Sequence, residues 1–139
     1  MAVTAEKIFV NLPIKDLDKS VEFFTKIGFE FNPQFTDQNA ACMVISEHIF
    51  VMLLVEPFFK TFTKKEIADA TKTTEVIIAL SAESKEKVDE IVNKALAAGG
   101  KASNEPFSQG DFMYGWSFQD LDGHLWEVMY MDQSTVHPM

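Results

Sequence analysis

FVNLPIKDLDKSVEFFTKIGF occupies residues 9–29 and decides the fold. The β-rich apolar run KIFVNLPI at residues 7–14 predicts a strand, and after it the spacing of apolar residues changes from two to three or four. That change predicts a helix over residues 17–27. Asp16 is suited to cap the start of this helix, and Gly28 is suited to the left-handed conformation that ends helices. The stretch therefore predicts a strand followed directly by a helix.

Three further strands and a linker complete the first half of the chain. Short β-rich runs at residues 29–31, 41–45 and 50–54 are separated by polar turn segments, which is typical of strands. Residues 56–74 are polar and only weakly helical in pattern, and we interpret them as a linker. The first half thus has the order strand, helix and three strands.

The same order of elements recurs after the linker. A strand is predicted over residues 75–81, followed by a helix that begins after the N-cap Ser84 and ends before Gly99. The Asp122-Gly123 pair predicts a hairpin turn near the end of the chain. The closing segments are a strand near 101–103, a loop around 104–110, a strand over 112–118, a turn at 119–123 and a strand over 125–130.

The two halves of the sequence align on each other. Phe9 pairs with Ile77, and Met52 pairs with Glu127. Repetition at this scale predicts two βαβββ modules, since each module has a sheet that cannot bury both of its faces alone. An unrepeated α+β sandwich is the alternative. We therefore expect one α+β domain over 1–139, divided into module 1 at about 7–55, a linker at about 56–74, module 2 at about 75–131 and a C-terminal tail at 132–139.

Composition and charge limit the partners of the protein. The chain has 139 residues, with 12 Lys and Arg against 21 Asp and Glu, which gives a net charge of −9. Nucleic acid is a poor candidate partner, because binding DNA or RNA needs a basic face that displaces counterions. The longest apolar run, residues 49–55, is shorter than the about 20 residues that a membrane helix needs. We expect neither a nucleic-acid partner nor a membrane span.

Phenylalanine and cysteine give two further indications. The 13 Phe residues predict either a heavily aromatic core or an aromatic-lined cavity. Cys42 is the single cysteine, so no intrachain disulfide is possible, which suits a reducing compartment. The N-terminal residues 1–6 show no signal-peptide pattern. We therefore expect a cytoplasmic protein.

Three segments of the chain carry a resemblance to a known family. They are residues 9–29, residues 76–100 with the sequence VIIALSAESKEKVDEIVNKALAAGG, and residues 120–130 with the sequence DLDGHLWEVMY. Together they resemble the vicinal oxygen chelate superfamily, which includes glyoxalases, bleomycin resistance proteins and extradiol dioxygenases. The resemblance implies two tandem βαβββ modules in an eight-stranded, cup-shaped sheet with helices on its outer face. It also implies a homodimer.

The resemblance also locates the metal positions of metal-dependent members, which place one His, Gln or Glu ligand on the first and one on the last strand of each module. Carried over to this sequence, these positions are Phe9, Met52, Ile77 and Glu127. Only Glu127 carries a donor that transition metals bind well. His48 and His124 fall in predicted turns and His137 in the tail, so they do not replace the missing donors. We expect neither a metal nor another cofactor.

Strand alternation gathers the candidate site on one face of the sheet. One interpretation is that this face forms a filled second core. The other is an apolar ligand pocket, edged by the aromatic side chains Tyr114 and Trp116. Strand 112–118 can turn either Tyr114 or Met113 inward, and its alternation does not choose between them. The other predicted site residues are Phe9, Asn11, Phe50, Met52, Ile77 and Glu127.

Two functions follow from this site. We expect a metal-free protein that binds a small organic molecule, cationic or aromatic, since a net charge of −9 favours encounter with cations. The alternative is a metal-independent isomerase or lyase in which Glu127 is the general base and Asn11 or a tyrosine polarises a carbonyl oxygen. A metal-dependent glyoxalase I or dioxygenase ranks below both, because most of its ligands are missing. A structural or partner-binding module stays open.

Overall fold

Each half of the chain folds into a sheet that packs a helix against one face. The computed structural model describes residues 2–132. By their contacts the residues form two compact units, with unit 1 ending at Ala68 and unit 2 beginning at Asp69. The predicted α+β class is confirmed.

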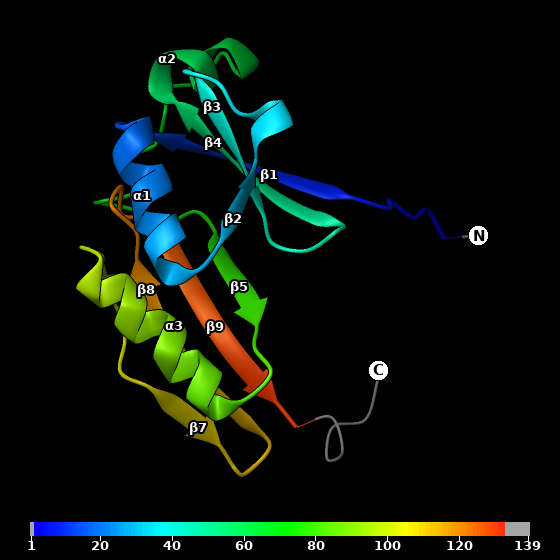
Figure 1. The fold of residues 1–139 in the computed structure, drawn as a ribbon, viewed down its shortest axis with the longest axis vertical. Coiled ribbons are helices and arrows are strands. Elements are labelled where there is room, and N and C mark those ends of the chain that lie inside the picture. The colour runs from blue at the N-terminus through cyan, green and yellow to red at the C-terminus, as the bar shows by residue number, and fades with distance from the viewer. Residues whose placement is uncertain (1, 133–139) are drawn as a thin grey trace. The chain divides into compact units, whose positions relative to one another are not determined.

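Unit 1 contains a four-stranded sheet. Its elements are β1 (Ile8–Ile14), α1 (Leu17–Ile27), β2 (Glu30–Asn32), η1 (Pro33–Phe35), β3 (Ala40–Val44), β4 (Ile49–Val55), α2 (Glu56–Phe59) and η2 (Lys60–Phe62). The strand order is β1-β4-β3-β2, with β1 parallel to β4 and the other pairs antiparallel. Figure 1 shows α1, in blue, beside these strands.

Unit 2 contains a five-stranded sheet. Its elements are β5 (Ile77–Ser81), α3 (Lys85–Ala97), β6 (Lys101–Ala102), β7 (Phe107–Gln109), β8 (Met113–Gln119) and β9 (Leu125–Met131). The order is β5-β9-β8-β6, and β7 also pairs with β8. As in unit 1, the first strand is parallel to the last, β9, and the helix α3 runs alongside the sheet (Figure 1).

The predicted order of elements is confirmed, with two corrections. The helix expected over residues 17–27 has those bounds, and unit 2 repeats the strand, helix and strand order of unit 1. The predicted loop 104–110 contains β7, so the described residues hold nine strands rather than eight. The predicted linker 56–74 begins with the short helices α2 and η2.

Helix α1 is capped at both ends and buries its aromatic side. The Asp16 carboxylate accepts a hydrogen bond from the Lys19 backbone N–H at 3.0 Å. Gly28 ends the helix at a φ of 123°, which few other residues adopt. Phe23 and Phe24 are buried, with ring centroids 4.9 Å apart in an edge-to-face arrangement. Burying each ring stabilises the fold by about 2–3 kcal/mol.

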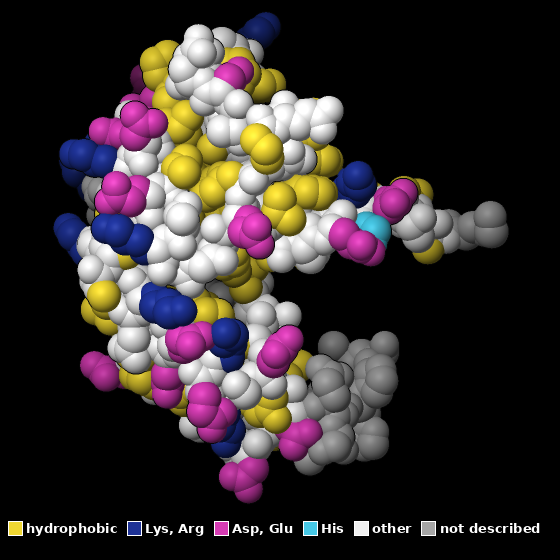
Figure 2. Space-filling view, viewed as in Figure 1, with side chains coloured by type: hydrophobic (Ala, Val, Ile, Leu, Met, Phe, Trp, Pro, Cys, Tyr) yellow, Lys and Arg dark blue, Asp and Glu magenta, His cyan; other side chains and the backbone are white. Residues whose placement is uncertain are grey.

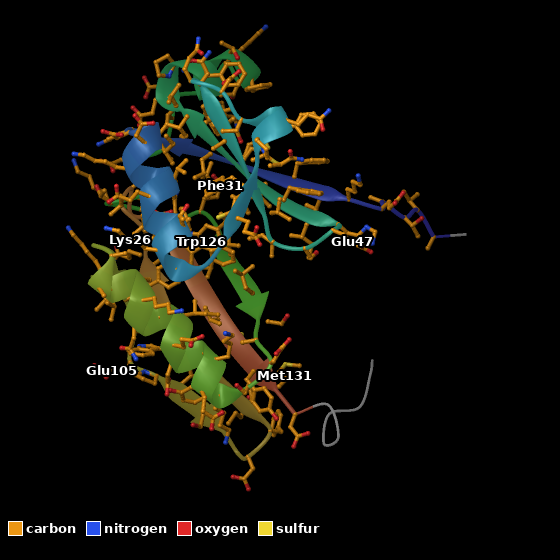
Figure 3. The ribbon with its side chains drawn as sticks, in the orientation of Figure 1. Lys26, Phe31, Glu47, Glu105, Trp126 and Met131 are labelled. Atoms are coloured by element: carbon orange, nitrogen blue, oxygen red, sulfur yellow. The ribbon has the colours of Figure 1, made fainter. Side chains whose placement is uncertain are left out.

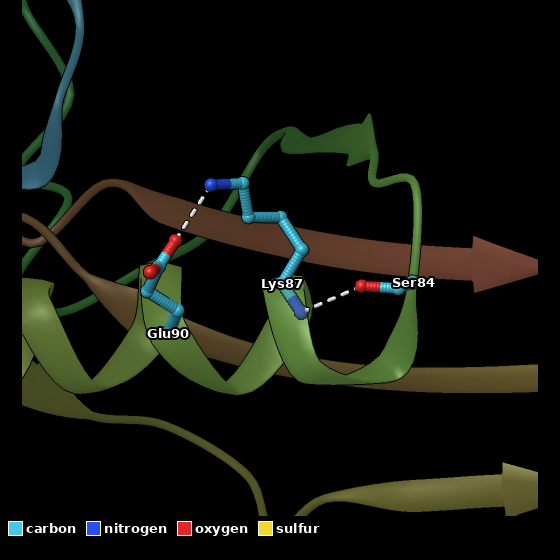
Figure 4. Close-up of polar contacts among 3 residues, drawn as sticks. All are labelled: Ser84, Lys87 and Glu90. Carbon is cyan, nitrogen blue, oxygen red and sulfur yellow. Dashed lines mark hydrogen bonds and ion pairs between the residues drawn. The ribbon is translucent and has the colours of Figure 1, made fainter.

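Helix α3 is capped and tied to the sheet of unit 2. The Ser84 hydroxyl oxygen accepts from the Lys87 backbone N–H at 3.0 Å, and Lys87 Nζ donates to Glu90 at 2.7 Å (Figure 4). The Tyr114 hydroxyl donates to Asp89 of the helix. This hydrogen bond, with partial burial, raises the pKa of Tyr114 to about 12. The helix therefore lies on the sheet face that carries Tyr114.

A buried carboxylate organises the turn between β8 and β9. Asp120 accepts hydrogen bonds from the backbone N–H groups of Asp122 and His124 and, at 3.0 Å, from the indole N–H of Trp126. Trp126 is fully buried and its ring lies parallel to that of Phe118. Burial raises the pKa of the Asp120 carboxyl, while the charge of His124 and the three hydrogen bonds oppose that rise. The turn thus fixes the start of β9.

Candidate functional site

The unit 1 sheet carries a stacked pair of aromatic rings on its open face. The register pairs Phe9 with Phe50 and Asn11 with Met52, so these four side chains share one face and the buried Leu53 lies on the other. The ring centroids of Phe9 and Phe50 lie 5.1 Å apart, and the ring planes differ by 14°. The Phe9 side of the stack is open, because Phe9 is 56% exposed.

One end of this face carries a cationic side chain, and the other end is buried and apolar. Lys7 Nζ lies 5.8 Å from the centroid of the Phe50 ring, close enough for a cation–π contact. Further along the face, Leu54 of β4 and Cys42 of β3 are buried. Burial raises the pKa of the Cys42 thiol, which keeps it a weak nucleophile. Figure 2 shows hydrophobic side chains gathered over the strands of unit 1.

In unit 2 the open face carries a carboxylate. Glu127 of β9 lies between Ala79 of β5 and Ser117 of β8 in the register, and these three side chains share one face with Ile77. Glu127 is half-buried, and Ile77 is 51% exposed. Within residues 2–132 the Glu127 carboxylate has neither a hydrogen bond nor an ion pair. Its charge is therefore available to a ligand.

The two open faces place their matched residues in the same way. In unit 1 the register partner of Phe9 lies two residues before Met52, and in unit 2 the register partner of Ile77 lies two residues before Glu127. Each pair is thus a diagonal pair on neighbouring parallel strands. The alignment of the two halves made from the sequence is confirmed by this register.

Tyr114 and Trp116 do not lie with Glu127. They alternate with Ser117 and share the opposite face, where the Tyr114 hydroxyl binds Asp89 of α3. The indole N–H of Trp116 donates to the backbone carbonyl of Asn104 at 3.0 Å. Of the two orientations that the alternation of strand 112–118 leaves open, the structure has the one in which β8 turns Tyr114 and Trp116 toward the helix side. That Tyr114 and Trp116 contact a ligand stays a prediction.

Phe107, which lies in the predicted loop 104–110, is an aromatic side chain that does share the face of Glu127. In the register Phe107 of β7 lies opposite Gly115, and Gly115 lies opposite Met129. The Phe107 ring covers Gly115. A glycine inside a strand pattern indicates that another group approaches closely, and this signal was present in the sequence at Gly115.

Comparisons with known proteins identify the family. A family model described as bleomycin resistance protein-like N-terminal matches residues 7–46. Hypothetical protein SA1046 from S. aureus, a solved structure, is 32% identical, covers 92% of this chain and 95% of its own, and has a TM-score of 0.76. A glyoxalase/bleomycin resistance protein/dioxygenase family enzyme from Burkholderia phytofirmans PsJN is 15% identical, covers 88% and 96%, and has a TM-score of 0.73. The chain belongs to the vicinal oxygen chelate superfamily.

Membership in the vicinal oxygen chelate superfamily establishes the fold and leaves the activity open. The fosfomycin resistance protein FosX from Listeria monocytogenes shares the fold at 19% identity, with 96% and 98% of the two chains covered and a TM-score of 0.66. No curated protein sequence matches the chain. The function must therefore be argued from the side chains on the two open faces.

The metal positions of the superfamily do not supply a metal-binding set in this chain. Phe9 and Ile77 have no donor atom, Met52 has only a thioether, and Glu127 is the single carboxylate. No group of three or more His, Cys, Asp or Glu side chains within residues 2–132 is placed to hold a metal ion. A transition metal bound by one carboxylate would keep most of its hydration shell. These residues do not fit the metal of the metal-dependent members.

The histidines and helices add two observations. His48 is exposed in the turn before β4 and lies 3.0 Å from the Glu47 carboxylate, and His124 lies in the turn before β9. His137 and the rest of 133–139 lie outside the described residues. Among the helices of the described chain, none is long and apolar enough to cross a membrane.

Proposed function

We propose that the protein binds a small aromatic organic molecule, without a metal ion, on the open face of the unit 1 sheet. The observation that carries this proposal is the Phe9–Phe50 stack, whose outer ring is 56% exposed. A large apolar ring left in water costs free energy that a stacked guest recovers. The family position at Phe9 thus offers a stacking surface in place of a metal ligand.

The chemistry around the stack defines the guest. An aromatic ring of the ligand extends the Phe9–Phe50 stack, and the Asn11 side chain on the same face supplies a polar anchor. Met52 beside Asn11 adds an adaptable apolar contact. The net charge of −9 raises the local concentration of cationic guests over neutral ones. We infer a cationic aromatic ligand.

The test measures binding by the full chain, in the presence of a chelator, to a panel of cationic and neutral aromatic compounds. Thermal shift identifies binders, and titration calorimetry measures their affinity. Phe9→Ala should weaken the best binder by about 0.5–1.5 kcal/mol, which is the contribution of one aromatic pair. Ile8→Ala is the matched control, because Ile8 is 54% exposed on the same strand but points to the other face.

Two results would count against this function. Binding of no compound by the unmodified protein contradicts it directly. Equal losses in Phe9→Ala and Ile8→Ala would show that the strand, and not the stack, is responsible. If a compound binds only without the chelator, and added transition metal restores its binding, the result would support the metal-dependent alternative.

A second candidate function uses Glu127 as the general base of a metal-independent isomerase or lyase. The support is that the Glu127 carboxylate is half-buried and has neither a hydrogen bond nor an ion pair within residues 2–132. Ser117, which carries a hydroxyl, is its neighbour in the register. The open-face residues of β5, β8 and β9 include no second titratable group, so a proton acceptor has no matched donor there. Unchanged turnover in Glu127→Gln would exclude this role, because removal of a general base lowers the rate by about 10²–10⁴-fold.

We also propose a homodimer and a cytoplasmic location. The dimer is supported by the family resemblance, and the location by the single cysteine, Cys42. Light scattering after gel filtration measures the first. Cell fractionation measures the second.

A further inference from the structure

The Phe107 ring takes the place of a side chain at Gly115. A Cβ atom at Gly115 would lie 2.7 Å from Cζ and 2.8 Å from Cε1 of Phe107, closer than real atoms approach. The φ of Gly115 lies outside the left-handed region. The glycine is therefore needed for the ring, and the backbone itself would accept another residue. The ring is held against β8 because nothing else projects from that position.

This arrangement brings the ring toward Glu127. The Phe107–Gly115–Met129 row and the Ser117–Glu127 row are neighbouring rows on the same face. Diagonal neighbours in a sheet lie about 7–8 Å apart, so one small ligand group can reach both the ring edge over Gly115 and the Glu127 side chain. Phe107 is 41% exposed, which leaves a large part of its ring open.

The remaining side chains of this face favour a cation with apolar substituents. Met129 is half-buried beside the ring, and Met131 is exposed at the end of β9. Thioethers accept methyl and methylene groups and make no strong bond to a hydrated ion. Among the strand residues of unit 2 that the structure describes, the one cationic side chain on this face is Lys101, which pairs with Gln119 at the end away from Phe107. Glu127 thus dominates the charge between the two rows.

We propose that Phe107 and Glu127 form a subsite on unit 2 for an organic ammonium ion, with Gly115 as the residue that seats the aromatic ring. The proposal rests on the part of the proposed function that assigns the protein a cationic organic ligand, and it concerns the open face of unit 2 alone. The ring face attracts the cation through its quadrupole, and the carboxylate neutralises it. A single carboxylate beside an aromatic ring and thioethers suits a substituted ammonium rather than a metal ion.

The experiment compares two probes that differ in charge alone. Benzyltrimethylammonium is the cationic probe, and its carbon analogue, in which a carbon atom replaces the nitrogen, is the neutral probe. Calorimetry on the full chain measures both affinities in the unmodified protein and in each variant. The expected result for the unmodified protein is tighter binding of the cation than of the neutral analogue.

Two variants separate the roles of ring and charge. Phe107→Leu keeps apolar area but removes the π face, and should weaken the cation about threefold with little change for the neutral analogue. Glu127→Gln should weaken the cation about fivefold and again spare the neutral analogue. Glu47→Gln is the control for the charge, because Glu47 is exposed in the turn before β4 of unit 1 (Figure 3). Phe62→Leu is the control for the ring, since Phe62 is exposed in unit 1.

The outcomes separate this proposal from the proposed function. A preference for the cation that is lost in both variants and kept in both controls supports the subsite. A cation bound equally by all of these variants but weakened in Phe9→Ala overturns the subsite and leaves the function of unit 1 standing. No binding of either probe, or of any aromatic compound, overturns both. Circular dichroism of Phe107→Leu, the milder change, confirms that a loss of binding is not a loss of folding.

Discussion

Unit 1 and unit 2 repeat one strand register with different side chains at the matched positions. In unit 1, Cys42 lies opposite Met52, and in unit 2, Ser117 lies opposite Glu127. Both units have the same strand pairing and bury one face of the sheet, although the side chains on their open faces differ chemically. The open faces have therefore been free to differ, and each must be interpreted from its own residues.

The units also differ in how the open face is filled. Ala40 lies opposite Leu54 in unit 1, whereas Gly115 lies opposite Met129 at the matched row of unit 2. Only at Gly115 does a neighbouring strand supply a ring over the row, from Phe107 of β7. Unit 1 carries its exposed ring on the edge strand β1 instead. The same backbone thus displays an aromatic surface at two different places.

The largest expected effect concerns the turns before β4 and β9. Asp120→Ala removes the acceptor of three hydrogen bonds, one of them from the buried indole N–H of Trp126, so the free energy of unfolding should fall by about 2–4 kcal/mol. In unit 1 the matched turn is exposed, and Ser46 accepts from the His48 backbone N–H at 3.3 Å. Urea unfolding should show a loss of about 0.5 kcal/mol or less for Ser46→Ala. Equal losses would contradict a special role for the buried carboxylate.

The second effect concerns the matched positions Gly115 and Ala40. Gly115→Ala should destabilise the protein by about 1–3 kcal/mol, because the new methyl group collides with Phe107. In the background Phe107→Ala the same change should cost little, so a double-mutant cycle in urea reports strong coupling. Ala40→Gly, the reverse change in unit 1, should cost about 1 kcal/mol from the lost buried methyl and the looser backbone. An uncoupled cycle would show that the ring moves aside freely.

The third effect concerns the hydroxyl that ties α3 to its sheet. Tyr114→Phe removes the hydrogen bond to Asp89 and should lower the free energy of unfolding by about 1 kcal/mol at neutral pH. The folded-state pKa of about 12 lies above the ordinary value of 10.0, so this contribution is complete below about pH 10 and is lost as the pH rises toward 12. Ultraviolet titration should show a tyrosinate transition near pH 12 that is absent in Tyr114→Phe. A transition of Tyr114 near pH 10 would disprove the tie.

Much of the fold could be predicted because periodicity and end signals agreed. Asp16 and Gly28 bracket an amphipathic run, and both caps are present in the structure. The repeat predicted the second unit from the first, since the matched pair Ile77 and Glu127 repeats the geometry of Phe9 and Met52. Strand β7 was missed because three residues are too few for an alternation to be recognised.

The face on which a candidate site residue lies could be predicted only for strands whose alternation distinguishes the two faces. Phe9 and Phe50 share the open face as the alternation indicates. On β8 both faces are apolar, so Tyr114 and Trp116 suggested a site although the helix side buries larger side chains better. The contact of Phe107 with Gly115 joins different strands, so the glycine within strand 112–118 indicates that some group approaches closely but does not identify Phe107 as that group. That any of these residues binds a ligand stays a prediction.

The smallest expected effect compares the exposed ion pairs on the two helices. Glu22 and Lys26 of α1 lie 3.0 Å apart with the acid first, whereas Lys87 and Glu90 of α3 lie 2.7 Å apart with the base first. The acid-first order agrees with the helix dipole, so Lys26→Ala should lower the free energy of unfolding by about 0.3–0.5 kcal/mol. Lys87 stands in the first turn, where the dipole disfavours a cation, so Lys87→Ala should cost less despite the shorter contact and the lowered pKa of Glu90. Thermal unfolding at low and high salt should show that the loss of stability in each of the two variants becomes smaller as the salt concentration rises. A larger loss of unfolding free energy in Lys87→Ala than in Lys26→Ala would mean that the shorter distance within the ion pair outweighs the effect of the helix dipole.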